Sequence, residues 1–338
     1  MTVLVTGATG FIAGHCIAEL LENGYAVRGT VRSLRTAQVD HLHAAAERTG
    51  GSLELVEATL DADEGWAKAV DGCTYVWHLA SPIPPGVPKD ENELIRPAVD
   101  GTLRVLRAAA ASGTVRRVVL TSSVDAISHG HPHSQTRALT EADWSTVDTA
   151  GPYARSKVYA ERAAWDFVAD SALELVVINP ALVLGPLLRA ESNTSIEVIR
   201  RLLARDMPAV PRIGFAVVDV RDLARIHRLA METPAAAGNR YIAAGEFRWM
   251  GEMAQVLAEE FKPRGYRVPT RPLPYWLMWT VARFDKTIRL ALSYVGARAD
   301  FSAARAERDL GWRTRPARDT IVDTAESLLA MGVVPARG

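Results

Sequence analysis

The chain has 338 residues, of which 48% are hydrophobic and 23% are charged, and its 39 basic and 39 acidic side chains give it a formal net charge of zero. This length and apolar fraction suffice for one large α/β domain with additions, or for two domains. The balanced charge gives no electrostatic reason to expect nucleic acid or a membrane surface as a partner, and we expect neither.

Strand-like and helix-like patterns alternate over the first 180 residues. Apolar, β-branched runs predict strands at 2–6, 26–31, 53–58, 74–79, 117–121 and 173–178. Helical patterns lie between them, ending near 21 and covering 36–48, 63–70, 92–111 and 153 to about 167. This alternation predicts an α/β fold of the Rossmann type, with a doubly wound parallel sheet and helices on both faces.

The pattern becomes less regular after Pro180, which predicts a smaller second lobe. Residues 217–222 and 241–243 resemble strands that return to the first lobe. We therefore expect residues 1–178, with returning segments near 217–245, to bind the cofactor. Residues 179–338 are expected to form mainly a substrate-binding lobe, and the boundary is interleaved.

The most apolar part of this second lobe is 273–295. Its four charged residues and short uncharged opening exclude a membrane span, which needs about 20 apolar residues, and favour a buried or pocket-lining helix. Trp249, Trp276 and Trp279 are expected either in a hydrophobic pocket or in the core.

Three small residues follow the first strand at a spacing of three. They are Gly7, Gly10 and Ala13. A tight turn and the close approach of a pyrophosphate each need a residue without Cβ, and a small third residue lets the helix pack on the strand. The spacing is not G-x-G-x-x-G, but its place after the first strand favours a dinucleotide site over a plain turn.

The second strand ends in arginine and not in an acid. In such folds an acidic residue about 20 positions after the glycines binds the ribose 2′-hydroxyl, whereas arginine suits a 2′-phosphate. Arg32 stands at the strand end and Arg35 follows in the next turn. The alternative is that the two arginines bind no phosphate and are simply solvated in a loop. Because guanidinium pairs with phosphate and stacks on adenine, we favour NADP(H) over NAD(H).

Tyr153 and Lys157 are four residues apart in a predicted helix, so they project from one face. A cation there lowers the pKa of the phenol, about 10 when free, and the pair can then protonate a substrate oxygen. The same spacing also suits a solvated helix face.

After the fifth strand, either Ser122 or Ser123 can donate to a carbonyl, because neighbours on a strand point oppositely. The residues alone leave that choice open.

Motifs along the whole chain together resemble one enzyme family. They are VTGATGFIA at 5–13, TVRS at 30–33, WHLASP at 77–82, TSS at 121–123, YARSK at 153–157, NPALVLGP at 179–186, VDVRDLA at 218–224 and LGW at 310–312. The set resembles the extended short-chain dehydrogenase/reductases. Within them it is most similar to dihydroflavonol reductases, cinnamoyl-CoA reductases and yeast-type NADPH-dependent methylglyoxal or aldehyde/ketone reductases. The motifs are specific for the family and not for the substrate.

The resemblance implies roles for individual residues. Tyr153 is the acid/base, Lys157 lowers its pKa and holds the nicotinamide ribose, and Ser123 orients the carbonyl. The implied cofactor-binding residues are Gly7, Thr9, Gly10, Phe11, Ile12, Arg32, Arg35, Leu60, Ala80, Ser81, Thr121, Tyr153, Lys157, Pro180 and Val183. One departure concerns the adenine contact: where relatives often carry Asp-Leu, this chain has Thr59-Leu60, and the acid is displaced to Asp61.

These features predict an NADPH-dependent reductase that converts an aldehyde or ketone reversibly to an alcohol, with a hydride from the nicotinamide and a proton from Tyr153. A nucleotide-sugar epimerase or dehydratase with tightly bound NAD is one alternative, and Arg32 argues against it. A non-catalytic NADP(H)-binding regulator is the other, and the retained Tyr153–Lys157 pair argues against that.

Two further residue groups have simple interpretations. His129, His131 and His133 alternate in one loop, and we predict a pocket rim and no metal, because no thiol is near and the reduction needs no metal. Cys16 and Cys73 fit no Cys-x-x-Cys pattern and are expected to be buried, reduced thiols. These thiols, and an N-terminus that lacks a basic signal-peptide region, favour a cytoplasmic protein. We expect either a monomer or a homodimer.

Overall fold

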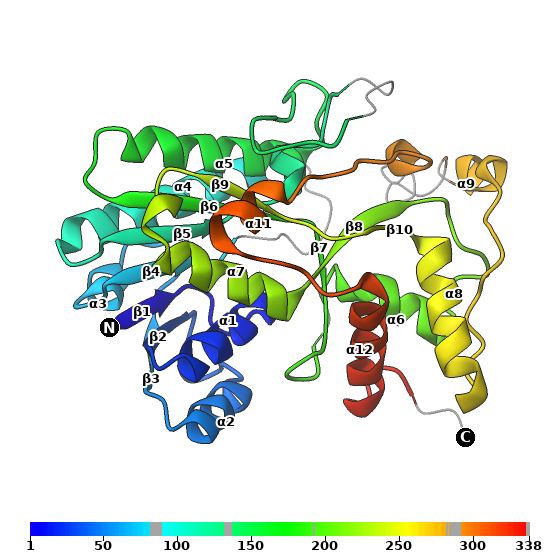
Figure 1. Cartoon of the computed structure of the whole chain (residues 1–338), viewed down its shortest axis with the longest axis horizontal. Helices are drawn as coiled ribbons and strands as arrows, with labels where there is room; N and C mark the ends of the chain where they lie inside the picture. Colours follow the sequence, from blue (N-terminus) through cyan, green and yellow to red (C-terminus); the bar gives the residue numbers. More distant parts are fainter. Residues whose placement is uncertain (82–89, 132–136, 192, 282, 284–291, 336–338) are drawn as a thin grey trace.

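The computed structural model describes residues 1–81, 90–131, 137–191, 193–281, 283 and 292–335 (Figure 1). Its centre is a parallel sheet of seven strands in the order β3-β2-β1-β4-β5-β6-β9. The strands are β1 (Thr2–Val5), β2 (Ala26–Val31), β3 (Leu53–Glu57), β4 (Tyr75–His78), β5 (Arg117–Thr121), β6 (Glu174–Pro180) and β9 (Arg240–Ala243). This is the Rossmann-type arrangement that the alternation predicts, and the strand order reverses between β1 and β4.

Helices cover both faces of this sheet. They are α1 (Phe11–Glu22), α2 (Asp40–Thr49), α3 (Trp66–Val70), α4 (Asn92–Ser112), α5 (Pro152–Val168), α7 (Val220–Glu232) and α11 (Ala304–Leu310). Side chains alternate between faces along a strand. Val3 and Val5 therefore pack with α1, α2 and α7, while Leu4 packs with α3 and α4. Burial on both faces explains why inner strands such as β1 and β6 are mostly apolar, whereas β3 at the edge of the sheet carries Glu54 and Glu57.

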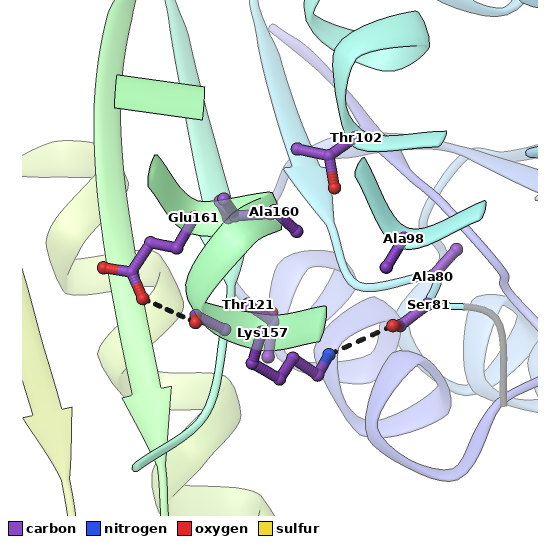
Figure 2. A pocket seen from close by; sticks show the side chains of 10 residues that line it. Ala80, Ser81, Ala98, Thr102, Thr121, Lys157, Ala160 and Glu161 are labelled. Atoms are coloured by element: carbon purple, nitrogen blue, oxygen red, sulfur yellow. Dashed lines mark hydrogen bonds between the residues drawn. The ribbon is translucent and has the colours of Figure 1, made fainter. Parts of the chain in front are cut away.

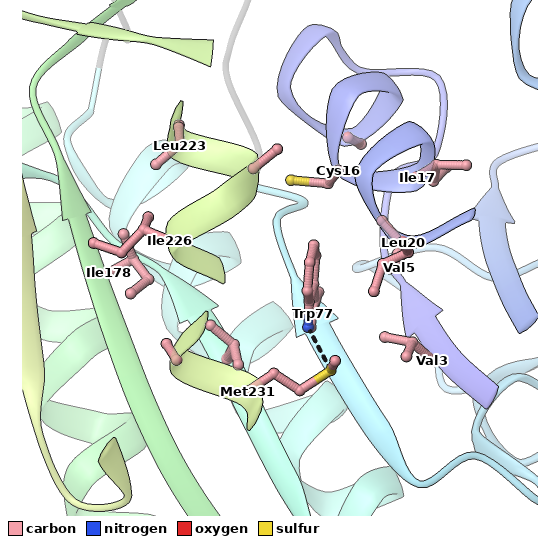
Figure 3. Packing of buried hydrophobic residues seen from close by; sticks show 14 of the residues in the cluster. Val3, Val5, Cys16, Ile17, Leu20, Trp77, Ile178, Leu223, Ile226 and Met231 are labelled. Atoms are coloured by element: carbon pink, nitrogen blue, oxygen red, sulfur yellow. Dashed lines mark hydrogen bonds between the residues drawn. The ribbon is translucent and has the colours of Figure 1, made fainter. Parts of the chain in front are cut away.

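Trp77 of β4 shows how one face is closed. Its side chain is fully buried between α1 and α7, and its indole Nε1 donates to Met231 Sδ at 3.2 Å (Figure 3). Cys16 and Leu20 of α1 and Leu223 of α7 belong to the same cluster. The face of the first sheet is thus covered by a helix from much later in the chain.

A second, three-stranded sheet lies beside the first. It consists of β7 (Leu182–Leu184), β8 (Gly214–Asp219) and β10 (Phe247–Trp249), with β8 parallel to β7 and antiparallel to β10. A separate core packs it against α6 (Ile196–Ala204), α8 (Met250–Phe261) and α12 (Ala317–Ala330). The short elements are η1 (Val124–Ala126), η2 (Pro234–Ala236), η3 (Lys262–Arg264), α9 (Tyr275–Val281) and η4 (Leu292–Tyr294).

The six predicted strands of the first 180 residues are all present, one of the two predicted later is confirmed, and other predictions need correction. The strand predicted at 217–222 is β8, which ends at Asp219 and belongs to the small sheet; Asp219 then caps α7 by accepting from the Arg221 amide at 2.8 Å. The strand predicted at 241–243 does return, as β9 beside β6. The helix predicted at 36–48 begins only at Asp40. The division into a cofactor part, 1–178, and a substrate part, 179–338, stays a prediction.

The apolar stretch after residue 273 also differs from expectation. The described helix there, α9, is not buried, because Tyr275, Trp276 and Trp279 are 57%, 67% and 48% exposed. Trp249 is half-buried and packs edge-to-face on Phe247, with ring centroids 4.9 Å apart. Residues 282 and 284–291 lie outside the described part of the chain. Among the helices that are described, none combines the length and apolarity needed to cross a membrane.

Candidate active site

The loop after β1 brings a bare backbone to the end of the sheet. Gly7 has a left-handed φ of 67°, and a Cβ placed there would lie 3.1 Å from the Ala80 Cβ. Gly10 caps α1 without any side-chain hydrogen bond to the first amides of that helix in the described part of the chain. Free amides at a helix N-terminus bind anions. Thr9, Phe11 and Ile12 are half-buried around this turn, so the loop fits a pyrophosphate.

A buried hydrogen-bond pair, which sequence reasoning missed, sets the position of this loop. The Thr6 Oγ1 accepts from the amides of Leu79 and Ala80 at 3.0 and 2.9 Å. Its proton is therefore directed to His78 Nδ1, 3.0 Å away. Burial, followed by the charge of Lys157, lowers the pKa of His78 to about 3, so the imidazole is neutral. This arrangement holds Ala80 against Gly7.

The end of β2 presents cations to solvent. Arg32 and Arg35 are both exposed, and neither forms an ion pair or side-chain hydrogen bond with any residue that the structure describes. The nearby Glu57 is instead occupied, since its Oε1 accepts from the Leu34 amide at 2.7 Å. A hydrogen bond from Thr59 is the main reason that the pKa of Asp61 is lowered, and Arg32 contributes. The two arginines thus suit an additional phosphate.

The structure distinguishes between the two serines after β5. Ser122 is buried and its hydroxyl donates to Glu161 Oε2 at 2.6 Å. Glu161 also accepts from Asn179 Nδ2 at 2.9 Å and pairs with Arg240 at 2.5 Å. Ser122 therefore belongs to a buried network. The Ser123 hydroxyl instead donates to Asp125 Oδ2 at 2.9 Å, and it lowers the pKa of Tyr153.

Tyr153 and Lys157 lie on one face of α5, as their spacing predicts. Pro152 begins this helix after Gly151, and the Lys157 Nζ is 5.6 Å from the centre of the Tyr153 ring. The ammonium donates to Ser81 Oγ at 3.0 Å, which ties α5 to the segment after β4 (Figure 2). A small cavity of about 20 Å³ lies beside it, lined by Ser81, Thr102, Lys157 and other residues drawn in the same view.

The two titratable groups have shifted pKa values. Burial lowers the pKa of Lys157 to about 8, although Asp125 and Glu161 oppose this change. The protein packed around Tyr153 raises its pKa even though 43% of the residue is exposed; Asp125 raises it further, and the bond to Ser123 lowers it. The direction for Tyr153 is opposite to the predicted one. The main reason is the burial of the phenol; the Asp125 carboxylate adds to it, while the Lys157 ammonium is directed to Ser81.

The remaining predicted cofactor residues lie at the ends of neighbouring strands or helices. Leu60 packs against Gly101 of α4, and Pro180 and Val183 are buried where β6 leads into β7. Thr121 is half-buried, and its hydroxyl lies 2.7 Å from His227 Nε2. The His227 Nδ1 donates to the Leu223 carbonyl, so Thr121 is the donor in this pair.

The predicted histidine loop is only partly described. The His129 Nε2 lies 2.9 Å from Asp125 Oδ1, and the His131 Nε2 donates to the Ile127 carbonyl at 2.6 Å. His133 lies outside the described residues, and among the described ones no three potential ligands gather around a point. Sequence reasoning missed Asp125 as part of the site. Its position two residues after Ser123 was the available signal.

The comparisons with known proteins agree with this geometry. The NAD dependent epimerase/dehydratase family matches residues 3–244. Cinnamoyl-CoA reductase 1 of Arabidopsis thaliana is 35% identical over 337 residues, covering 98% of this chain and 90% of its own length. Tetraketide alpha-pyrone reductase 1 of the same plant is 32% identical over 339 residues, with 98% and 96% covered.

Solved structures give the same result. The crystal structure of yeast methylglyoxal/isovaleraldehyde reductase Gre2 complexed with NADPH superimposes with a TM-score of 0.80 at 28% identity, covering 98% of this chain and 99% of that one. Vestitone reductase from alfalfa superimposes with a TM-score of 0.75 at 28% identity, with 98% and 99% covered. Both the matched sequence and the shared fold lead to one conclusion: the chain belongs to the NAD dependent epimerase/dehydratase family, among the extended short-chain dehydrogenase/reductases.

Proposed function

We propose that this protein reduces an aldehyde or ketone to an alcohol with NADPH, in a reversible reaction. The observation that carries the proposal is the meeting of Tyr153, Lys157 and Ser123 at the carboxyl end of the sheet, where α/β folds bind their ligands. Relatives that are reductases by name, including one solved with NADPH, support it.

The residues present fit the cofactor. The amides at the start of α1 and the open turn at Gly7 suit its pyrophosphate, and Arg32 and Arg35 suit its 2′-phosphate. Lys157 would hold the nicotinamide ribose, Ala80 and Pro180 would flank the cofactor, and the backbone around Val183 would meet the carboxamide. When bound, NADPH supplies the hydride.

The protein's own groups supply orientation and the proton. The Tyr153 hydroxyl protonates the substrate oxygen as negative charge develops on it. A phenol is protonated at neutral pH, and the raised pKa of Tyr153 preserves this state, so it has a proton to donate. Ser123 follows β5 beside the Tyr153–Lys157 pair, and it would orient the substrate carbonyl. Lys157, with a pKa of about 8, is mainly an ammonium at pH 7.

The decisive experiment compares two tyrosines of α5. Tyr153→Phe should still bind NADPH, measured by cofactor fluorescence, and should lose carbonyl reduction by a factor on the order of 10³. Tyr159→Phe removes a hydroxyl from a residue of the same helix that is 40% exposed, and it should keep full activity. A Tyr153→Phe variant with unchanged turnover would overturn the proposed function.

Two alternatives make different predictions. A nucleotide-sugar epimerase would copurify with NAD and would not oxidise NADPH with a simple ketone; the exposed Arg32 and Arg35 at the end of β2 argue against it. A regulator would bind NADPH and turn over none of a panel of aldehydes, α-keto esters and aryl ketones; the Tyr153–Lys157 pair argues against it.

We also propose the division of labour between the parts of the chain. Residues 1–178 mainly hold the cofactor and residues 179–338 mainly shape the substrate pocket. Cys16 and Cys73 are free and buried, which supports a reducing, cytoplasmic location. A monomer or homodimer is expected, and light scattering on the purified chain would measure which one forms.

A further inference from the structure

An acidic residue contacts the catalytic serine. Asp125 lies in η1, two residues after Ser123, and its Oδ2 accepts from the Ser123 hydroxyl at 2.9 Å. The same hydroxyl oxygen accepts from the Asp125 amide at 3.1 Å. Because Ser123 donates its single proton to this carboxylate, it can donate to a substrate oxygen only after that proton turns away from Asp125, and its remaining lone pair is open to the Tyr153 hydroxyl.

A histidine fixes the other oxygen of this carboxylate. The His129 Nε2 lies 2.9 Å from Asp125 Oδ1, and the His129 ring packs edge-to-face on Tyr294, with centroids 6.1 Å apart. The backbone is held as well, because Ser145 Oγ accepts from the His129 amide at 2.8 Å and donates to the Asp125 carbonyl at 2.7 Å. The carboxylate therefore has a defined direction, although its side chain is 31% exposed.

The groups that face Asp125 come from three elements. Tyr153 and Lys157 belong to α5, His129 follows η1, and Tyr294 lies in η4. The negative charge of Asp125 raises the pKa of Tyr153, of Lys157 and of Tyr294. Lys157 is the nearby cation on α5, and its ammonium donates a hydrogen bond to Ser81 Oγ. The charge of Asp125 is thus directed at the acid/base pair.

We propose that Asp125, braced by His129, is a positioning residue of the active site: it sets the direction of the Ser123 hydroxyl and supplies the negative charge that faces Tyr153 and Lys157. This inference rests on the proposed reductase function. The charge of Asp125 keeps Tyr153 and Lys157 protonated until a substrate carbonyl binds. Asp125 itself transfers no proton and forms no bond to the substrate.

A purely structural role for Asp125 makes a different prediction. If the residue only shapes the turn after β5, replacing it would lower stability and leave the pH dependence of turnover unchanged. If its charge acts on Tyr153 and Lys157, replacement lowers the pKa of both groups, because both are raised by that charge. The loss of carbonyl reduction at alkaline pH then begins at a lower pH.

The experiment measures kcat for carbonyl reduction against pH in matched variants. Asp125→Asn keeps the shape of the side chain and removes its charge. The alkaline limb of the profile, the pH range over which kcat falls as the pH rises, should then move to lower pH by roughly one unit. Asp148→Asn is the control, since Asp148 is exposed and precedes α5 by four residues. It should leave the limb in place. NADPH binding by the Asp125→Asn protein shows that it is folded.

His129 provides an independent test should Asp125→Asn not fold. His129→Ala removes the brace and should move the limb in the same direction, whereas His129→Gln keeps an N–H donor and should restore the wild-type profile. An unmoved limb in a folded Asp125→Asn or His129→Ala variant, with wild-type kcat, overturns the inference and leaves the reductase proposal standing. A wild-type protein that reduces no carbonyl overturns both.

Discussion

The Ser122 hydroxyl donates to Glu161 Oε2 at 2.6 Å, and this bond separates the tasks of two neighbouring serines. Ser122→Ala should leave kcat nearly unchanged and lower the free energy of unfolding by about 1–3 kcal/mol, because a buried carboxylate loses a donor. Ser123→Ala should do the reverse and lower kcat by a factor on the order of 10². Denaturant titrations and steady-state kinetics on the two variants measure this. Equal kinetic losses would contradict the assignment.

The preference for NADPH should depend on the two arginines after β2. Changing both Arg32 and Arg35 to Ser should raise the dissociation constant for NADPH by about 100-fold and leave that for NADH unchanged, because only the former carries a 2′-phosphate. The effect should shrink at high salt, since both side chains are exposed. Arg48→Ser is the control, because Arg48 is also exposed and pairs with Glu22. A loss of equal size for NADH would count against a 2′-phosphate site.

Substrate charge should matter, because the Asp125 carboxylate lies one hydrogen bond beyond Ser123. An α-keto acid carries its own carboxylate beside the reacting carbonyl, and this negative charge is repelled by that of Asp125. An α-hydroxy ketone of similar size carries no such charge. The wild-type protein should therefore favour the neutral ketone, and Asp125→Asn should raise the relative kcat/KM of the acid by about tenfold, or about 1.4 kcal/mol. Competition assays with the two substrates measure the ratio. A ratio that Asp125→Asn leaves unchanged would contradict this.

Acid should destabilise the fold through His78. The unfolded imidazole has a pKa of about 6.5 and the folded one about 3, so between these values the unfolded state binds the extra proton. Stability is therefore complete above pH 6.5 and falls as the pH drops toward 3. At pH 5 the loss from His78 is on the order of 2 kcal/mol. Urea titrations at pH 7 and pH 5 should show a smaller difference for His78→Gln than for His43→Gln, in which an exposed histidine is replaced. Equal differences would exclude His78.

Much of the fold was predictable because its signals are local. An apolar run between turn residues identifies a buried strand, and the predicted bounds of β2 and β5 equal the observed ones. The phosphate loop and the Tyr153–Lys157 face follow in the same way from spacing alone. The residue that faces the acid/base pair was not predictable, because the direction of Asp125 depends on His129, Ser145 and Tyr294 together. The exposure of Trp276 and Trp279 depends equally on packing that no short pattern records.

The return of β9 to the edge of the main sheet affects how the chain is made. β6 gains its outer neighbour only when residues 240–243 pair with it, and Trp77 is enclosed only when α7 is present. During synthesis, the seven-stranded sheet therefore cannot be completed before residue 243 has emerged from the ribosome. Until then β6 is an unpaired apolar edge, the kind of surface that recruits other chains. A fragment ending at 178 should consequently aggregate, and the two halves should fold as one cooperative unit.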